Sequence, residues 1–360
     1  MRYISCFALF ALVACGTPPS AGFEEQAYDP AETNSDRSPE TEQDRRPNSD
    51  PQPEQDPQPE QDPQPEQDPQ PEQDPQPEQD PQPEQDPQPE QDPQPEQDPQ
   101  PEEEGEVVDF GEAGAFTWTE TTEQYRASPE CEMTYLTFEP QEQVASGTVV
   151  FLHGFARGRS QFLDWGRQLA SWGYQSVVTD LCHASPSGVD PVAGGEAIVS
   201  LLDALGIEES IIVGHSAGSM AALVTGSGSG AVVAVLGLDP VAPQEGDLAP
   251  QAQALDGQLA ALYGDPGQCN SENSGRAVYD QGRALSLSLP GATHCDFEAP
   301  SNAICSLFCG GSGGPEVAVT LKRLVTSYVS WKFGNAGAGA WWTPGAEPFE
   351  ALEAQGAIRR

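Results

Sequence analysis

The amino-acid sequence predicts an α/β domain over residues 107–360, with a mostly parallel sheet and helices on both faces. Two observations lead to this prediction. Short apolar runs rich in Val, Ile and Leu alternate with longer segments of helical spacing. Polar residues suited to chemistry directly follow several of these runs, as expected where the carboxyl ends of parallel strands share one edge of a sheet.

Most of the predicted strands are continuous apolar runs, which is typical of strands that are buried on both faces. The first, residues 133–138, instead alternates apolar and polar side chains and is expected at an edge. The other strands are expected over 148–152, 175–181, 209–213, 231–238, 259–263 and 284–289. Helices are expected over 160–172, 191–205, the small-residue segment before the glycine run 226–230, and 317–333. The tail 335–360 contains Trp341 and Trp342 and is expected to fold back on the domain surface.

The domain is organised around residues 210–222, which read Ser-Ile-Ile-Val-Gly-His-Ser-Ala-Gly-Ser-Met-Ala-Ala. A buried strand, a sharp Gly-x-Ser-x-Gly turn and a helix form the context that a nucleophile elbow requires. Gly214 and Gly218 leave room for a strained backbone at Ser216. The Ala217 N–H at the start of the helix is a candidate oxyanion donor. A tight turn without chemistry is the competing interpretation.

A second Gly-x-Ser-x-Gly match occurs at residues 310–314, around Ser312. No strand precedes it, and Pro315 after it marks the start of a separate helix. We interpret this match as a loop.

A nucleophilic serine needs a base, and the base needs an orienting acid. Of the four histidines, only His294 follows the nucleophile after the last strand, which makes it the candidate base. Two acids fall after intervening strands: Asp239 in Asp-Pro-Val and Asp265 in Gly-Asp-Pro-Gly. In His153-Gly154-Phe155, after the first central strand, the Phe155 N–H is the second candidate oxyanion donor. A capping role for His294 and a plain turn at Gly154 are the alternatives.

Residues 130–333 resemble an α/β-hydrolase of the group that holds chlorophyllases, dienelactone hydrolases and cutinase-like polyesterases. The matching motifs are Leu-His-Gly-Phe (152–155), Gly-His-Ser-Ala-Gly (214–218), Gly-Leu-Asp-Pro-Val (237–241) and Gly-Ala-Thr-His (291–294). The chlorophyllase-like branch is the most similar, and this resemblance places the acid on Asp239. Most α/β-hydrolases would place it one strand later, on Asp265.

The N-terminal region predicts an anchor and a stalk. Residues 1–14 resemble a lipoprotein signal peptide, with an apolar stretch too short to span a bilayer before Leu-Val-Ala-Cys, so Cys15 is the expected lipidation site. An ordinary secretory signal is the alternative.

Residues 15–106 contain Pro-Gln-Pro-Glu-Gln-Asp repeated eight times from Pro51 to Asp98. Alternating prolines and like charges predict an extended, disordered acidic stalk, with a recognition ligand as the competing interpretation.

Apart from Cys6 in the signal and Cys15, six cysteines remain: Cys131, Cys182, Cys269, Cys295, Cys305 and Cys309. This even number in an exported domain predicts up to three disulfides, one of them in the region 295–309. Zinc binding at Cys305 and Cys309 competes weakly, because no Cys-x-x-Cys pair accompanies them. We therefore predict no metal site.

These observations together predict a serine hydrolase that cleaves carboxylic esters through an acyl-enzyme on Ser216. The expected partners are a small or polymeric ester and, through Cys15, a membrane of the bacterial cell envelope, either the outer membrane or the cell surface. The acidic balance, 57 Asp and Glu against 15 Lys and Arg, argues against nucleic-acid binding. No cofactor is implied, and the protein is expected to be a monomer. The alternative is a catalytically silent surface-binding module with the same fold.

Overall fold

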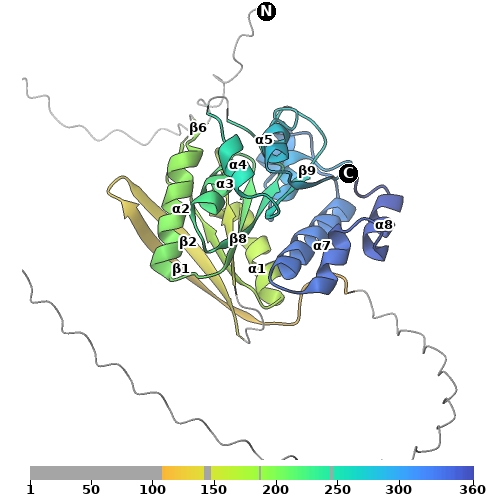
Figure 1. The fold of residues 1–360 in the computed structure, drawn as a ribbon, viewed down its shortest axis with the longest axis horizontal. Coiled ribbons are helices and arrows are strands. Elements are labelled where there is room, and N and C mark those ends of the chain that lie inside the picture. The colour runs from red at the N-terminus through yellow and green to blue at the C-terminus, as the bar shows by residue number, and fades with distance from the viewer. Residues whose placement is uncertain (1–107, 142–146, 186–187, 244–245) are drawn as a thin grey trace, which may run out of the picture. The chain divides into compact units, whose positions relative to one another are not determined.

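A computed structural model describes residues 108–141, 147–185, 188–243 and 246–360 of the 360-residue chain. The signal peptide, Cys15 and the repeats lie outside the described residues. Figure 1 shows the fold of the chain. Within the described part, eight strands form one sheet in the order β1-β2-β4-β3-β7-β8-β9-β10. Their bounds are β1 Trp118–Ser128, β2 Cys131–Pro140, β3 Thr148–Leu152, β4 Gln175–Thr179, β7 Ser210–His215, β8 Val232–Leu238, β9 Leu259–Tyr263 and β10 Leu285–Ser288.

Six neighbouring strands, from β4 to β10, are parallel, whereas β2 pairs antiparallel with both β1 and β4. An antiparallel hairpin that leads into a parallel sheet is also how α/β hydrolases begin. The predicted α/β fold class is thus confirmed, and the arrangement is consistent with an α/β-hydrolase-like fold.

The helices connect the strands and cover both faces of the sheet. Their bounds are α1 Leu163–Ser171, α2 Pro191–Leu205, α3 Gly218–Gly228, α4 Ala249–Ala254, α5 Arg276–Gln281, α6 Ala303–Phe308, α7 Pro315–Lys332 and α8 Glu347–Ala354. Short 3-10 turns are η2 Arg159–Phe162, η3 His294–Phe297 and η4 Ala336–Trp342, and β5 Ala184–Ser185 pairs with β6 Gly188–Val189 in a small hairpin. Asp190 caps α2 by accepting two backbone N–H bonds, and Gly206 ends it in a left-handed conformation.

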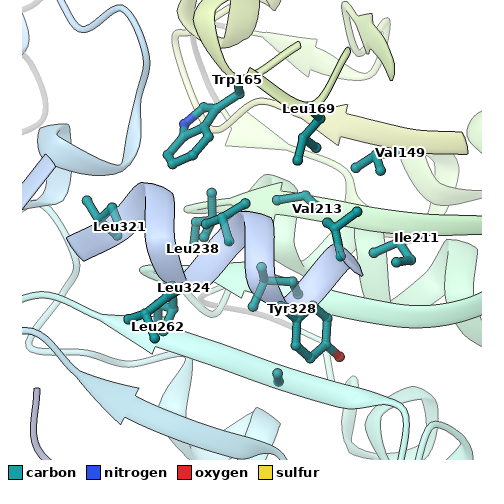
Figure 2. Packing of buried hydrophobic residues seen from close by; sticks show 14 of the residues in the cluster. Val149, Trp165, Leu169, Ile211, Val213, Leu238, Leu262, Leu321, Leu324 and Tyr328 are labelled. Atoms are coloured by element: carbon teal, nitrogen blue, oxygen red, sulfur yellow. The ribbon is translucent and has the colours of Figure 1, made fainter. Parts of the chain in front are cut away.

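Two apolar clusters lie on opposite faces of the sheet, because side chains alternate along each strand. Ile211 and Val213 of β7 belong to one cluster and Ile212 to the other. The first cluster packs against α1, α7, η4 and α8, and the second against α2, α3, α4 and α5. Figure 2 shows the first, in which α1, α7 and the strands contribute Trp165, Leu169, Leu321, Leu324, Tyr328, Val149, Ile211, Val213, Leu238 and Leu262.

The expectation of an edge strand at residues 133–138 is wrong. This segment is β2, the second strand, and the edge is formed by β1, which the sequence pattern did not indicate. The reason lies in the composition of β1: Trp-Thr-Glu-Thr-Thr-Glu-Gln-Tyr-Arg-Ala-Ser is mostly exposed along its length and lacks an apolar face. Its register comes from pairing with β2 rather than from burial.

The C-terminal tail folds back on the domain, as expected. Trp342, Phe349 and Ile358 are buried in the first cluster. Ser288 of β10 and Arg359 exchange both backbone hydrogen bonds, so the tail covers part of the last strand's open edge.

Candidate active site

Ser216 lies in a sharp turn between β7 and α3, with a backbone φ of +56°. A non-glycine residue in this region carries roughly 1–3 kcal/mol of strain, which is common where a side chain is held for chemistry. Close packing around the turn requires glycines. A Cβ at Gly218 would overlap the carbonyl groups of Leu152 and His153, and one at Gly214 would overlap the Gly218 backbone. The strand-turn-helix context that the sequence predicts is therefore present.

Asp239 follows β8 directly and is fully buried, with a φ of +45°. Its Oδ1 accepts a hydrogen bond from the Gly264 N–H at 2.9 Å. The Asn270 amide donates to both carboxylate oxygens, at 3.1 and 3.3 Å. The third partner of this carboxylate is His294, which bonds Oδ2.

His294 is the first residue of η3, and its Nδ1–H donates to Asp239 Oδ2 at 2.6 Å. The buried His215 bonds the backbone of His294: its Nε2–H donates to the His294 carbonyl at 3.0 Å. Burial lowers the pKa of His215 well below its usual value, and the nearby His294 lowers it further, so His215 acts as a neutral donor. The Asp239 bond fixes the tautomer in which Nε2 of His294 is free to accept a proton.

The backbone hydrogen bonds of Ser216 place it beside this pair. Its N–H donates to the Leu238 carbonyl at 3.0 Å, and its carbonyl accepts from the Val241 N–H at 3.2 Å, so Ser216 is bonded to residues on both sides of Asp239. Within the described chain, neither Ser216 Oγ nor His294 Nε2 has a hydrogen-bond partner, and no bond joins the two. Such bonds are often formed only once substrate is bound.

The loop after β3 passes directly over the serine. A Cβ at Gly154 would lie 2.6 Å from Ser216 Cβ and 3.1 Å from its Oγ, so only glycine allows this approach. In the described residues, the N–H groups of Phe155 and Ala217 have no acceptor. Two such donors beside a serine hydroxyl have the chemistry of an oxyanion hole.

His153 braces this loop rather than entering the chemistry. Its Nδ1–H donates to the Gly154 carbonyl at 2.9 Å, and its Nε2 accepts from the Leu181 N–H at 2.8 Å. The ring is buried, and burial lowers its pKa. Both hydrogen bonds of His153 require a neutral imidazole, because protonation of Nε2 would remove the acceptor for the Leu181 N–H.

The two alternatives from the sequence lie in turns. Asp265 is exposed, and its Oδ2 accepts from the Gly291 N–H at 2.9 Å, with no bond to His294 within the described residues. Ser312 is exposed in the loop before α7, and its hydroxyl donates to Asp296 at 2.8 Å. Within the described residues, His294 is thus hydrogen-bonded to Asp239 and not to Asp265, and Ser216, unlike Ser312, lies in a turn between a strand and a helix.

Local sequence patterns do not indicate three further residues that support the site: Asn270, Arg157 and Glu298. Asn270 is buried and links Asp239 to the turn at 265–270, since its amide also donates to the Asp265 carbonyl at 2.9 Å. Arg157 Nε donates to Glu298 Oε1 at 2.6 Å, which joins the loop after β3 to the segment after η3. Contacts across 31 and 141 residues leave no signal in local sequence patterns.

All six cysteines of the domain form disulfides, Cys131–Cys182, Cys269–Cys309 and Cys295–Cys305, so the predicted maximum of three is confirmed. Cys305 and Cys309, the weak zinc candidates, are thus each bonded to another sulfur rather than present as thiolates. Three disulfides suggest a protein that folds outside the cytoplasm. In the described part of the chain, every helix is too short or too polar to span a bilayer.

No protein-family model matches this chain, and no curated protein matches it either. The fold and the geometry of the site, together with the sequence motifs, are therefore the basis for a proposed function.

Proposed function

We propose that the domain is a serine hydrolase that cleaves carboxylic esters. The observation that carries the proposal is the hydrogen bond from His294 to the buried Asp239, formed beside a serine in a strained strand-turn-helix elbow. These three residues supply a nucleophile, a base and an orienting acid. The resemblance to the chlorophyllase, dienelactone hydrolase and cutinase-like group supports the same assignment, with Asp239 as the acid.

In the proposed reaction, His294 Nε2 accepts the Ser216 proton as Oγ attacks the ester carbonyl. The oxyanion that forms accepts hydrogen bonds from the N–H groups of Phe155 and Ala217, aided by the N-terminus of α3. His294 then returns the proton to the departing alcohol, which leaves an acyl group on Ser216. Water, deprotonated by His294, hydrolyses this acyl-enzyme, while Asp239 stabilises the imidazolium in both steps.

The charges around the site favour an uncharged ester. The cationic side chains of Arg157 and Arg159, on the loop after β3, are each paired with a carboxylate, Glu298 and Asp180. They are therefore already neutralised and offer little attraction to an anionic substrate. Phe155 is 39% exposed beside Gly154 and supplies an apolar surface for the acyl or alcohol part.

The N-terminal region suggests where this activity operates. We propose that Cys15 carries the lipid and that residues 15–106 hold the domain away from a membrane of the bacterial cell envelope. Two or more acyl chains on one cysteine anchor a protein stably. Polyproline II rises about 3.1 Å per residue, so the 48 residues of the eight repeats would span roughly 150 Å if fully extended.

A fluorophosphonate probe tests the proposal, because it labels only an activated serine. The wild-type protein is expected to be labelled and to hydrolyse short p-nitrophenyl esters. Ser216→Ala is expected to lose labelling and at least ~10³-fold in kcat, because the nucleophile is gone. Ser312→Ala, in the other Gly-x-Ser-x-Gly match, is the control and is expected to behave as wild type. Wild-type turnover by Ser216→Ala would overturn the proposal.

A further inference from the structure

An ion pair between Arg157 and Glu298 joins the loop that lies over Ser216 to the segment after η3. Arg157 Nε donates to Glu298 Oε1 at 2.6 Å, and the Ser301 hydroxyl donates to Glu298 Oε2 at 3.1 Å. The Glu298 side chain has no solvent exposure, and that of Arg157 is 19% exposed. Burial raises the pKa of Glu298, while Arg157 and Ser301 act in the opposite direction.

The two ends of this pair lie close in sequence to groups of the proposed mechanism. Arg157 comes two residues after Phe155, which supplies one oxyanion donor. Between them, Ala156 has a φ of +54°, a conformation that alanine adopts only under constraint. Glu298 directly follows η3, which begins with His294. The ion pair therefore connects the oxyanion loop to the segment that carries the base.

Backbone hydrogen bonds already hold these segments together without the ion pair. The Asp164 N–H donates to the Ala299 carbonyl, and the Ala299 N–H donates to the Gln161 carbonyl, both at 2.8 Å. The Trp165 indole N–H donates to the Phe297 carbonyl at 2.9 Å. A buried ion pair is weak support for stability, because desolvation offsets the attraction between the charges. Its effect is therefore expected on the geometry of the loop more than on folding.

We propose that Arg157 and Glu298 are positioning residues that set the Phe155 N–H against the oxyanion formed at Ser216. This inference rests on the proposed ester hydrolysis. The Arg157 side chain bonds the residue after the strained Ala156 to Glu298, while His153 bonds the Gly154 carbonyl at the opposite end of the loop. The donor is then fixed before substrate arrives, which is the condition under which such donors accelerate a reaction.

The experiment compares two ion pairs on the same loop. Arg157→Met and Glu298→Gln are each expected to lower kcat ~10–100-fold while KM stays within about twofold, since the donor is displaced rather than removed. Arg159→Met is the matched control. Arg159 pairs with Asp180, has no hydrogen bond or ion pair with residues 294–298 in the described part of the chain, and keeps its backbone N–H bond to Asp180. This control is expected to keep wild-type kcat and KM.

Two further variants separate positioning from folding. Arg157→Lys retains the charge and is expected to recover part of kcat. The double variant Arg157→Met/Glu298→Gln is expected to be no slower than either single variant, because both changes remove one interaction. Phenylboronic acid, which forms a tetrahedral adduct with an activated serine, is expected to bind Arg157→Met more weakly in proportion to its loss of kcat.

Wild-type kcat in folded Arg157→Met and Glu298→Gln would overturn the positioning role, as would an equal loss in Arg159→Met. Melting temperatures of all variants report whether they are folded. Ser216→Ala distinguishes a failure of the proposed hydrolase activity from a failure of the positioning role. If it remains active, the proposed function fails. If it is inactive while Arg157→Met and Glu298→Gln keep full kcat, only the positioning role fails.

Discussion

At the scale of single residues, Asp239 receives hydrogen bonds from the Gly264 N–H, the Asn270 amide and the His294 ring. Pro240 follows Asp239 directly. The residues before and after these two, Leu238 and Val241, are both hydrogen-bonded to the backbone of Ser216. The carboxylate is therefore fixed in position and direction before any substrate binds. An orienting acid requires this arrangement.

Asp239→Asn is expected to lower kcat by several orders of magnitude, about 10⁴ in the best-studied serine triad, because an amide at this position favours the wrong tautomer of the base. Ester hydrolysis at saturating substrate measures the effect. Asp265→Asn is the matched control, since its carboxylate bonds only the Gly291 N–H in the described structure, and less than a tenfold loss is expected. A reversed order of the two effects would place the acid one strand later.

The buried histidines His153 and His215 predict a dependence of stability on pH. Burial lowers both pKa values in the folded protein, whereas the unfolded chain has the ordinary value near 6.5. The unfolded state then binds more protons as the pH falls below ~6.5. The stabilisation that these two residues provide is thus complete above that pH and is lost progressively below it. Each contributes a slope of at most ~1.4 kcal/mol per pH unit.

Denaturant unfolding at pH 5–8 measures this effect. His215→Gln keeps an N–H donor for the His294 carbonyl but does not titrate, so the slope below pH 6.5 is expected to become shallower. Equal slopes in wild type and His215→Gln would show that His215 does not contribute.

At the scale of elements, two disulfides attach α6 to the segments that support the site. Cys295, next to His294, bonds Cys305 within α6, and Cys269, next to Asn270, bonds Cys309 at its C-terminal end. The third disulfide, Cys131–Cys182, joins β2 to the segment after β4. The first two therefore hold the surroundings of His294 and Asp239, the proposed base and acid.

Removal of Cys295–Cys305 by a double serine substitution is expected to lower both stability and activity. The closed loop of 10 residues predicts a loss of ~3 kcal/mol. We expect kcat to fall about tenfold, because the turn that presents His294 is less constrained. Removal of Cys131–Cys182, whose cysteines are 51 positions apart in the sequence, is the comparison: ~4 kcal/mol of stability is expected to be lost, with kcat within about twofold of wild type. Denaturant unfolding measures the stability of both variants, and initial rates below both melting temperatures measure kcat. Equal kcat values in the two variants would contradict this prediction.

At the scale of the whole molecule, the charge is divided unevenly along the chain. Residues 16–106 hold 29 acidic and three basic side chains, whereas residues 107–360 hold 28 acidic and 11 basic ones. Chains of like charge repel themselves and extend, which suits a spacer. The activity proposed for the domain depends on none of the repeat residues.

Cys15→Ser is therefore expected to release the full chain from membranes without a change in kcat. The reason is that acyl chains on Cys15 supply the proposed anchorage, while the site lies entirely within residues 153–298. Fractionation of cells followed by ester hydrolysis in each fraction measures both properties. Membrane association of Cys15→Ser that persists in high salt would point to another anchor.

Local patterns in the sequence are sufficient for the elements with a strong apolar signal and for the residues that follow them. Residues 210–213 are apolar apart from Ser210, and Gly-His-Ser-Ala-Gly follows them at 214–218. Strand, turn and candidate nucleophile can therefore be predicted from neighbouring residues. For this turn, the tertiary structure shows in addition only that Gly214 and Gly218 have no room for a side chain. The exposed β1 lacks an apolar face, and its place in the sheet is set by its pairing with β2.

The pairing of His294 with Asp239 rather than Asp265 is a contact across 55 residues, and the tertiary structure decides it. Both acids follow strands, so the sequence left both assignments open. In the fold, β8 lies next to β7, and Ser216 follows the end of β7. Hydrogen bonds from Asn270 and Gly264 hold the Asp239 carboxylate where it also bonds His294. The same holds for Arg157 with Glu298 and for the three disulfide pairings. Side chains that meet across such distances do so because sheet order and loop closure bring them together.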